Sequence, residues 1–181
     1  WHETVHKTAF KTRWINEIFY HISSFMADFE GFRWRWSHTF HHSYTLQTKD
    51  DYDHEIQISR PTDLIAFFLN FIPFSDLLFP HRLIKYEVIK HAFGYFSPVV
   101  KISAPAKQKK KILWNSRLYL FIWISIIILS VYFETFLLIL YFILPTYYGK
   151  PLWFLVNVTQ HLGAAIDTKD HRENTYSIKI N

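Results

Sequence analysis

The chain has 181 residues, of which half are hydrophobic and a fifth are aromatic, and it carries a formal net charge of +5. This composition excludes a disordered chain and predicts extensive contact with lipid or with a lipid-like substrate. Because the chain contains no cysteine, disulfide bonds and thiolate metal sites are also excluded, and any metal must be held by histidines and carboxylates.

The first ten residues, WHETVHKTAF, contain the pattern His-Glu-x-x-His. His2 and His6 are four residues apart, so a helix would place both on one face. Two hypotheses compete for this pattern. In a zinc peptidase, His2 and His6 would hold zinc and Glu3 would activate water. In a membrane-bound di-iron oxygenase, the two histidines would be the first part of a larger ligand set.

Residues 7–36 mix scattered charges with aromatic side chains and predict one amphipathic helix or a pair of them. The segment RWRWSHTFHHSYT follows, with His38, His41 and His42 in the pattern HxxHH. On a helix these three histidines share one face, so three imidazoles can converge on one point. The isolated histidines are expected to be ordinary hydrogen-bonded residues of the core or surface: His21, His54, His81 and His91.

Residues 63–79 are apolar but short, and polar residues and Pro73 interrupt them. We expect one or two helices lying in the membrane interface, because the stretch is too short to span a bilayer. A run of basic residues then precedes the longest apolar segment. An excess of Lys and Arg marks the cytoplasmic end of a membrane span, and the residues concerned are Lys101, Lys107, Lys109, Lys110, Lys111 and Arg117.

Residues 118–144 form one long apolar run. A single helix here would be about 40 Å long against a hydrocarbon core of about 30 Å, and it would bury Glu134 in lipid. The sequence therefore predicts a transmembrane hairpin over about 112–158: a helix over about 112–133, a turn at Glu134 and a helix over about 136–158. Kinks are expected at Pro145 and Pro151. The predicted fold is an all-α, multi-pass membrane protein with amphipathic helices on the cytoplasmic side.

Two crossings return the chain to the cytoplasmic side at His161, where the other histidine clusters also lie. Neutral imidazoles without cysteine suit iron, zinc or copper. Six histidines exceed what one tetrahedral zinc requires, so two metals sharing them are the natural alternative. Redox-active iron beside lipid-facing helices suggests oxygen chemistry on a hydrocarbon chain, because no side chain alone can remove hydrogen from an unactivated methylene.

The segments HETVH, RWRWSHTFHHSYT and TQHLGAAIDTKDHRENT, in this order and separated by a hairpin, resemble the integral-membrane fatty acid desaturases. The resemblance covers essentially the whole chain and includes KTRWIN and HAFGYFSP. It implies a cytoplasmic-side centre of two non-haem iron ions that introduces a cis double bond into an acyl chain with O2. The metal ligands that it implies are His2, His6, His38, His41, His42 and His161.

The resemblance also implies an electron donor such as ferredoxin or cytochrome b5, and a substrate carried as acyl-CoA, acyl carrier protein or acyl-lipid. Membrane lipids are expected partners and nucleic acid is not. No catalytic residue is expected beyond the metal centre. Three residues are expected to lie around it: Glu3 orienting a ligating imidazole, Asn157 near a metal-bound water one helical turn before His161, and His171 with no assigned role.

The sequence departs from the desaturases in one respect, because their third box, another HxxHH, is absent from residues 162–181. The chain also opens without methionine and ends abruptly in NTYSIKIN. We therefore expect residues 1–181 to be a single partial desaturase domain, truncated at both ends. Without the third box it would lack part of its ligand set and be inactive alone.

Three alternatives remain. A hydroxylase or ketolase of the same superfamily, acting on a lipid or hydrocarbon, would share the histidine boxes. A membrane zinc peptidase would explain HETVH but would leave HTFHH and His161 as coincidences. A non-enzymatic membrane scaffold would make all the histidines incidental. Product analysis, peptide cleavage and metal content distinguish them.

Overall fold

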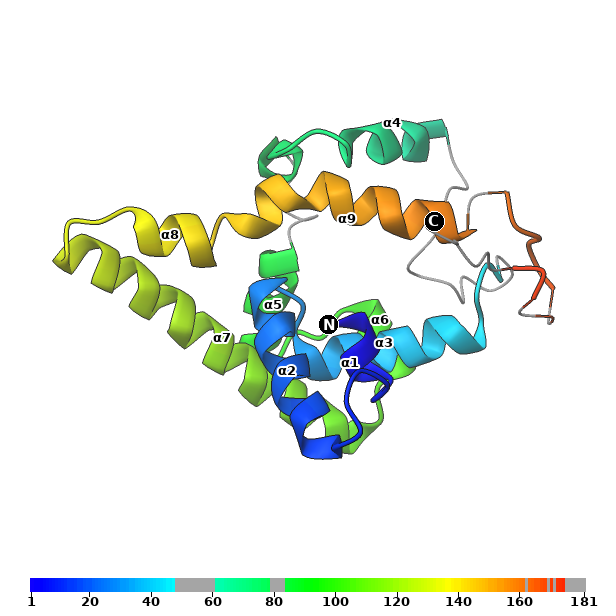
Figure 1. Cartoon of the computed structure of the whole chain (residues 1–181), viewed down its shortest axis with the longest axis horizontal. Helices are drawn as coiled ribbons and strands as arrows, with labels where there is room; N and C mark the ends of the chain where they lie inside the picture. Colours follow the sequence, from blue (N-terminus) through cyan, green and yellow to red (C-terminus); the bar gives the residue numbers. More distant parts are fainter. Residues whose placement is uncertain (48–60, 79–83, 162, 169, 171, 175–181) are drawn as a thin grey trace. The chain divides into compact units, whose positions relative to one another are not determined.

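The structure is a computed structural model that describes residues 1–47, 61–78, 84–161, 163–168, 170 and 172–174. The described residues form helices and contain no strand (Figure 1), so the all-α prediction is confirmed for this part of the chain. In chain order the helices are α1 (His2–Val5), α2 (Arg13–Met26), α3 (Gly31–Ser43), α4 (Pro61–Leu69), η2 (Ser75–Leu78), α5 (Ile84–Ala92), α6 (Pro98–Ser103), α7 (Ala106–Tyr132), α8 (Leu137–Phe142) and α9 (Pro145–His161).

The chain divides into two compact units. The first unit comprises Trp1–Ser37 and Phe79–Thr146, and the second comprises His38–Leu78 and Tyr147–Asn181. One boundary falls inside α3 and the other inside α9, so each of these helices belongs to both units.

In the first unit, α5 packs along α7, α8 contacts α7, and α1 contacts α2. Two small apolar clusters hold these helices together. The first is built on Val88, Tyr119 and Trp123, which join α5 to α7. The second is built on Val100, Ala104 and Ile112, which join α6 to α7. Burial of such side chains is worth about 1.5–3 kcal/mol each, so α7 is the element on which the unit is assembled.

Helix α7 is the membrane-span candidate of the part of the chain that the structure describes, by its length and apolarity. Its 27 residues correspond to about 40 Å of helix. The buried residues recur at helical spacing along one face, whereas Phe121, Ile128 and Val131 are exposed. Exposed apolar side chains around most of a long helix favour contact with lipid. The buried face consists of Ile112, Ser116, Tyr119, Trp123, Ile126 and Ser130.

The predicted turn at Glu134 is where α7 ends. Glu134 adopts a φ of 49°, in the left-handed region that usually terminates a helix, and α8 begins three residues later at Leu137. The prediction of one second helix over about 136–158 is wrong. The structure divides this stretch into α8 and α9, with a break at Ile143 and Leu144.

Proline explains the break between α8 and α9. A proline disfavours the helical conformation of the residue before it and is favoured at the first position of a helix, and Pro145 occupies that position in α9. Pro151, by contrast, lies inside α9 without interrupting it. A second membrane crossing through these two helices stays a prediction.

The predicted amphipathic segments are helical. Residues 7–36 contain α2 and the start of α3, and residues 63–79 contain most of α4 and η2. On α2 the side chains of Trp14, Ile18 and Ile22 form an exposed apolar stripe, with relative exposures of 65%, 48% and 57%. Exposed apolar residues also occur on α4 and η2, among them Ile65, Phe68 and Leu78. Such stripes are typical of helices that lie on a membrane surface.

Glu30 fixes the start of α3. Its carboxylate accepts hydrogen bonds from the backbone N–H groups of Phe32 (3.1 Å) and Arg33 (2.6 Å), which have no partner within the helix. The Asn115 amide of α7 donates to the same carboxylate. At Gly31 a Cβ atom would lie only 2.9 Å from the His21 ring, so glycine allows α2 and α3 to approach closely. Together these contacts set the direction of the helix that carries the second histidine box.

Candidate metal centre

Helix α1 presents the first histidine box. His2 opens the helix and His6 caps its C-terminal end, and their ring centroids lie 4.9 Å apart. Trp1 anchors the helix, because its ring stacks on Phe29 at 4.8 Å and contacts Trp34 of α3 at 3.9 Å. The short α1 is therefore held by aromatic packing against the α2–α3 turn and against α3, and this packing positions its two imidazoles.

The second box lies on α3 with all three histidines within its last two turns. The Nε2 atoms of His38 and His42 face each other at 2.9 Å. Two imidazole lone pairs at this distance repel each other unless a proton or a cation lies between them. The pair is therefore suited to share a bound ion. His38 and His41 are buried, whereas His42 is exposed.

Each unit contributes a close pair of box histidines. In the first unit the ring centroids of His2 and His6 lie 4.9 Å apart, and in the second unit the Nε2 atoms of His38 and His42 lie 2.9 Å apart. Although the boundary between the units falls after Ser37, α3 continues through it as one helix. The first turns of α3 pack on Trp1 through Trp34, and one helical turn further the same helix carries His38.

His41 and His161 form a second neighbouring pair, within the second unit. Their ring centroids lie 5.2 Å apart with the planes nearly perpendicular. His161 is the last residue of α9 and is buried. The structure thus brings His41 next to His161, which comes from a distant part of the sequence at the end of the apolar segment.

Asn174 fixes His161, a role that the sequence analysis did not assign. The His161 Nδ1 atom lies 3.2 Å from the main-chain oxygen of Asn174. A carbonyl oxygen only accepts hydrogen bonds, so Nδ1 carries the proton and Nε2 keeps its lone pair for a metal. The buried Asn174 side chain in turn donates to the Thr45 oxygen at 3.1 Å, and the Thr45 hydroxyl donates to the His41 oxygen at 2.8 Å.

A signal for Asn174 was present in the sequence, because it lies in the segment DHRENT that takes part in the resemblance. A buried asparagine that is hydrogen-bonded through both its side-chain amide and its main-chain oxygen holds its neighbours in one arrangement. From sequence alone the contact with Thr45 cannot be foreseen, since nothing local indicates which distant carbonyl the amide meets.

The protonation state of the first box favours metal binding. Burial lowers the pKa of His6, and the neighbouring His2 lowers it further. His6 is therefore neutral near pH 7 and offers a lone pair, as a metal ligand must. Glu3 is exposed, and its Oε1 atom lies 3.4 Å from His2 Nδ1. Its other oxygen accepts a hydrogen bond of 2.8 Å from the Thr8 hydroxyl, and this bond and the His2 contact lower its pKa.

The remaining candidates are placed as follows. Asn157 belongs to α9, one helical turn before His161, but its side chain lies outside the described residues, as does His171. His54 and His81 also lie outside them. His91 is a buried structural histidine whose Nε2 accepts a hydrogen bond from the Ser97 N–H at 3.1 Å.

The donor set fits the metal centre that the sequence predicts. The candidate ligands are imidazoles without cysteine: a close pair in the first unit, and in the second unit a close pair on α3 together with the contact between His41 and His161. Imidazole nitrogens are intermediate between hard and soft ligands, and they bind iron, zinc or copper. A structural zinc would need at most four of these residues. His161 carries its proton on Nδ1 and His6 is neutral, so each keeps one nitrogen lone pair. This agrees with a role as metal ligands.

Comparison with known proteins identifies the family. The sequence model described as fatty acid desaturase matches residues 1–181, the whole chain. No curated protein matches the chain, and no solved structure matches it.

Proposed function

The chain belongs to the fatty acid desaturase family, an oxidoreductase family whose members are membrane-bound, and from this membership we propose that it takes part in introducing a double bond into a fatty acyl chain. The substrate would be an acyl chain carried as acyl-CoA, acyl carrier protein or acyl-lipid. The observation that carries the proposal is the close spacing of the histidines within each box, His2 with His6 and His38 with His42.

In this proposal two iron ions are held by His2, His6, His38, His41, His42 and His161. Bound iron supplies the oxidising power that amino-acid side chains lack for removing hydrogen from an unactivated methylene. The reaction takes two hydrogens with their electrons from adjacent carbons of the acyl chain. Together with two electrons from a donor of the ferredoxin or cytochrome b5 class and two protons from the surrounding water, they reduce one O2 to two waters.

The residues of the chain have separate tasks. The Trp1 contacts hold α1 on α3, and the Asn174 main-chain oxygen holds the proton of His161 on Nδ1. Fixing ligands in this way reduces the reorganisation needed when metal binds. In this proposal the exposed apolar faces of α2 and α7 would contact lipid, from which an acyl chain could reach the metal centre.

We further propose that the metal group lies on the cytoplasmic side. The lysines at the start of α7 support this, because basic residues are retained on that side. A second crossing through α8 and α9 would bring His161 back to the side on which His2 and His38 lie. With a single crossing, His161 would be separated from the other boxes by the bilayer.

Product analysis tests the reaction. Cells that express the gene are supplied with a saturated fatty acid, and their acyl chains are analysed by mass spectrometry with and without the protein. Desaturation gives a mass lower by two hydrogens. A product heavier by one oxygen would instead identify a hydroxylase, and cleavage of peptides with no change in lipids would identify a zinc peptidase.

A further inference from the structure

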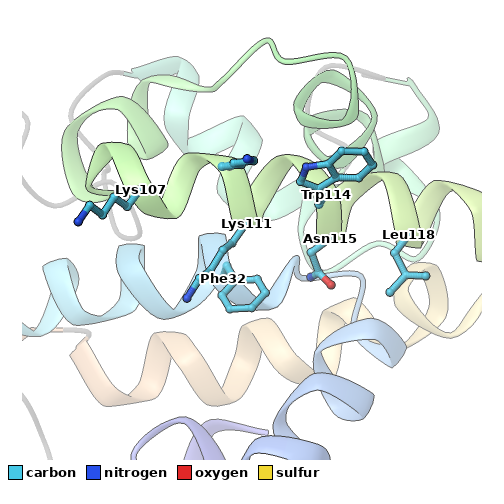
Figure 2. A pocket seen from close by; sticks show the side chains of 7 residues that line it. Phe32, Lys107, Lys111, Trp114, Asn115 and Leu118 are labelled. Carbon is cyan, nitrogen blue, oxygen red and sulfur yellow. The ribbon is translucent and has the colours of Figure 1, made fainter.

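A pocket of about 520 Å³ lies in the first unit between α7 and the start of α3. It is separate from the histidine boxes, since no histidine belongs to its described lining. Figure 2 shows Lys111 reaching from α7 to the ring of Phe32 on α3, with Asn115 and Leu118 on the same side of α7. The lining residues are Phe32, Lys107, Lys110, Lys111, Trp114, Asn115 and Leu118.

The charges of this pocket have one sign. Its described lining includes three lysines and no acidic side chain. The lysines are exposed, so a ligand can reach them from water or from the membrane surface. Lys111 lies with Nζ 5.6 Å from the centroid of the Phe32 ring, which holds one ammonium group over the apolar part of the pocket. The pocket therefore suits an anion that has an apolar portion.

The lining changes from charged to apolar along α7. Lys107, Lys110 and Lys111 come first, Trp114 follows one turn later, and Leu118 another turn beyond. Lys107 to Leu118 covers about 16 Å of helix. The headgroup region on each side of a bilayer is roughly 5 to 8 Å thick. If α7 crosses the membrane from its lysine-rich end, the lysines lie among the headgroups and Leu118 lies in the hydrocarbon.

The aromatic side chains are held at the boundary between these regions. Trp114 is 58% exposed, and the Arg117 guanidinium lies 4.8 Å from its ring centroid. Tryptophan prefers the level where headgroups meet acyl chains. Asn115 is bonded to the buried Glu30, which ties this part of α7 to the start of α3, the helix that carries Phe32.

We propose that this pocket binds one anionic phospholipid. The phosphate lies on the lysines, and the first part of an acyl chain lies against the apolar side chains Phe32, Trp114 and Leu118. Along α7 the basic residues come before the apolar ones, which is the order of phosphate and acyl chain in a phospholipid along the membrane normal. Binding of a water-soluble phosphate compound would not require this order. The proposal goes beyond the proposed reaction, because such binding needs neither iron nor an acyl substrate at the histidines.

Tryptophan quenching tests the site directly. The protein is placed in phosphatidylcholine vesicles that contain a minor share of either brominated phosphatidylglycerol or brominated phosphatidylcholine. Bromine quenches only nearby indoles, and subtracting the Trp114→Phe variant isolates the Trp114 signal. We expect Trp114 to be quenched at much lower mole fractions of the anionic lipid than of the zwitterionic one. Equal quenching by both lipids would overturn the proposal.

Two double variants of equal charge separate a site from general attraction to the membrane. Lys107→Gln with Lys111→Gln removes two lysines of the pocket, and Lys101→Gln with Lys109→Gln removes two lysines outside its lining. Both variants lose the same general attraction to an anionic surface, about fivefold for each lysine near it. The pocket variant alone also loses contacts to the bound phosphate, so it should require more anionic lipid than the control, and equal weakening in both would contradict a defined site.

Two further measurements complete the test. Lys101, Lys107 and Lys111 are exposed and Lys109 is half-buried, so none of the four is a core residue, and circular dichroism should show unchanged helix content in both double variants. Inorganic phosphate at matched ionic strength should leave the quenching unchanged, since it lacks the acyl contacts. Displacement of the lipid by inorganic phosphate would mean that the pocket takes a soluble phosphate compound, which would overturn the assignment to a lipid.

Discussion

The Nδ1 atom of His161 lies 3.2 Å from the main-chain oxygen of Asn174, and Asn174 is itself completely buried. This contact determines which nitrogen of His161 carries the proton. It also joins the end of α9 to Thr45, beyond the second histidine box, through the Asn174 side chain. The orientation of one proposed ligand thus depends on a residue outside the histidine boxes.

Replacing Asn174 by alanine should weaken metal binding. The Asn174→Ala change removes the hydrogen bond to Thr45, so the segment that holds His161 loses its anchor. Loss of such a supporting residue typically lowers metal affinity about 10- to 100-fold. Chelator competition measures this, with Arg172→Gln as the control because Arg172 is 89% exposed. Unchanged affinity in Asn174→Ala would contradict the positioning role.

The buried ion pair between Asp28 and Lys85 should be important for stability. Lys85 also donates to the Ile143 oxygen at 3.1 Å and to the Thr146 hydroxyl at 3.0 Å. Asp28→Asn removes only the charge and keeps a residue that tolerates the φ of 59° found there. Leaving Lys85 without its carboxylate should cost about 3–5 kcal/mol.

Denaturant unfolding in detergent measures the cost of this change. The matched control is Asp170→Asn, which breaks an exposed pair with Arg172 and should cost less than about 1 kcal/mol. Adding Lys85→Met to Asp28→Asn should restore part of the stability, because it removes the uncompensated charge. Equal effects of Asp28→Asn and Asp170→Asn would show that the buried pair contributes no more than a surface pair.

The stability of the protein should fall as the pH rises toward neutrality because of Glu30. Burial raises the pKa of Glu30 from 4.5 to about 7, although hydrogen bonds from Asn115 and backbone N–H groups oppose the rise. Between these values the folded state keeps a proton that the unfolded state has lost. The stabilisation is therefore complete below about pH 4.5 and is lost as the pH passes 7, with a total of up to about 3 kcal/mol.

Unfolding measured across this pH range, with the Glu30→Gln variant beside the wild type, tests the contribution of Glu30. Glu30→Gln cannot titrate and should abolish the fall. The control, Glu17→Gln, alters a partly exposed carboxylate on α2 paired with Arg35 and should leave the fall in place. The same pH dependence in Glu30→Gln and in the wild type would rule out Glu30 as its source.

The two-crossing topology predicts a specific labelling pattern. The chain contains no cysteine, so single cysteines can be introduced without background at Lys107, Glu134 and Thr159. A membrane-impermeant maleimide applied to intact cells should label Glu134→Cys. It should reach Lys107→Cys and Thr159→Cys only after permeabilisation. Labelling of Thr159→Cys together with Glu134→Cys from outside would place His161 across the membrane from the other boxes.

Local sequence features predicted much of the fold. The length of the apolar run and the single acidic residue within it indicated that α7 ends near Glu134, because burying a carboxylate in lipid is costly. The spacing of His38, His41 and His42 predicted a common helix face, and they do share α3. The predicted second helix of the hairpin is divided beside Pro145, where a kink was expected, because proline is favoured at the first position of a helix.

The arrangement of the histidines could not be derived from local pattern. The contact of His41 with His161 depends on how α9 ends and on where Asn174 packs, and the position of His2 depends on the packing of Trp1. Such contacts join distant parts of the sequence through aromatic stacking and single hydrogen bonds. Neither kind of contact leaves a periodic pattern in the sequence, so both can be identified only in the folded structure.

Metal content tests the central claim most directly. The protein is expressed from its own gene in iron-supplied cells and purified without chelator. Its bound iron and zinc are then measured beside His38→Ala and the control His21→Ala. Mössbauer spectroscopy of iron-57 protein reports whether the iron is non-haem and coupled in pairs. We predict paired non-haem iron in the wild type and in His21→Ala, and its loss in His38→Ala. Zinc in its place, or iron that His38→Ala leaves unchanged, would contradict the account.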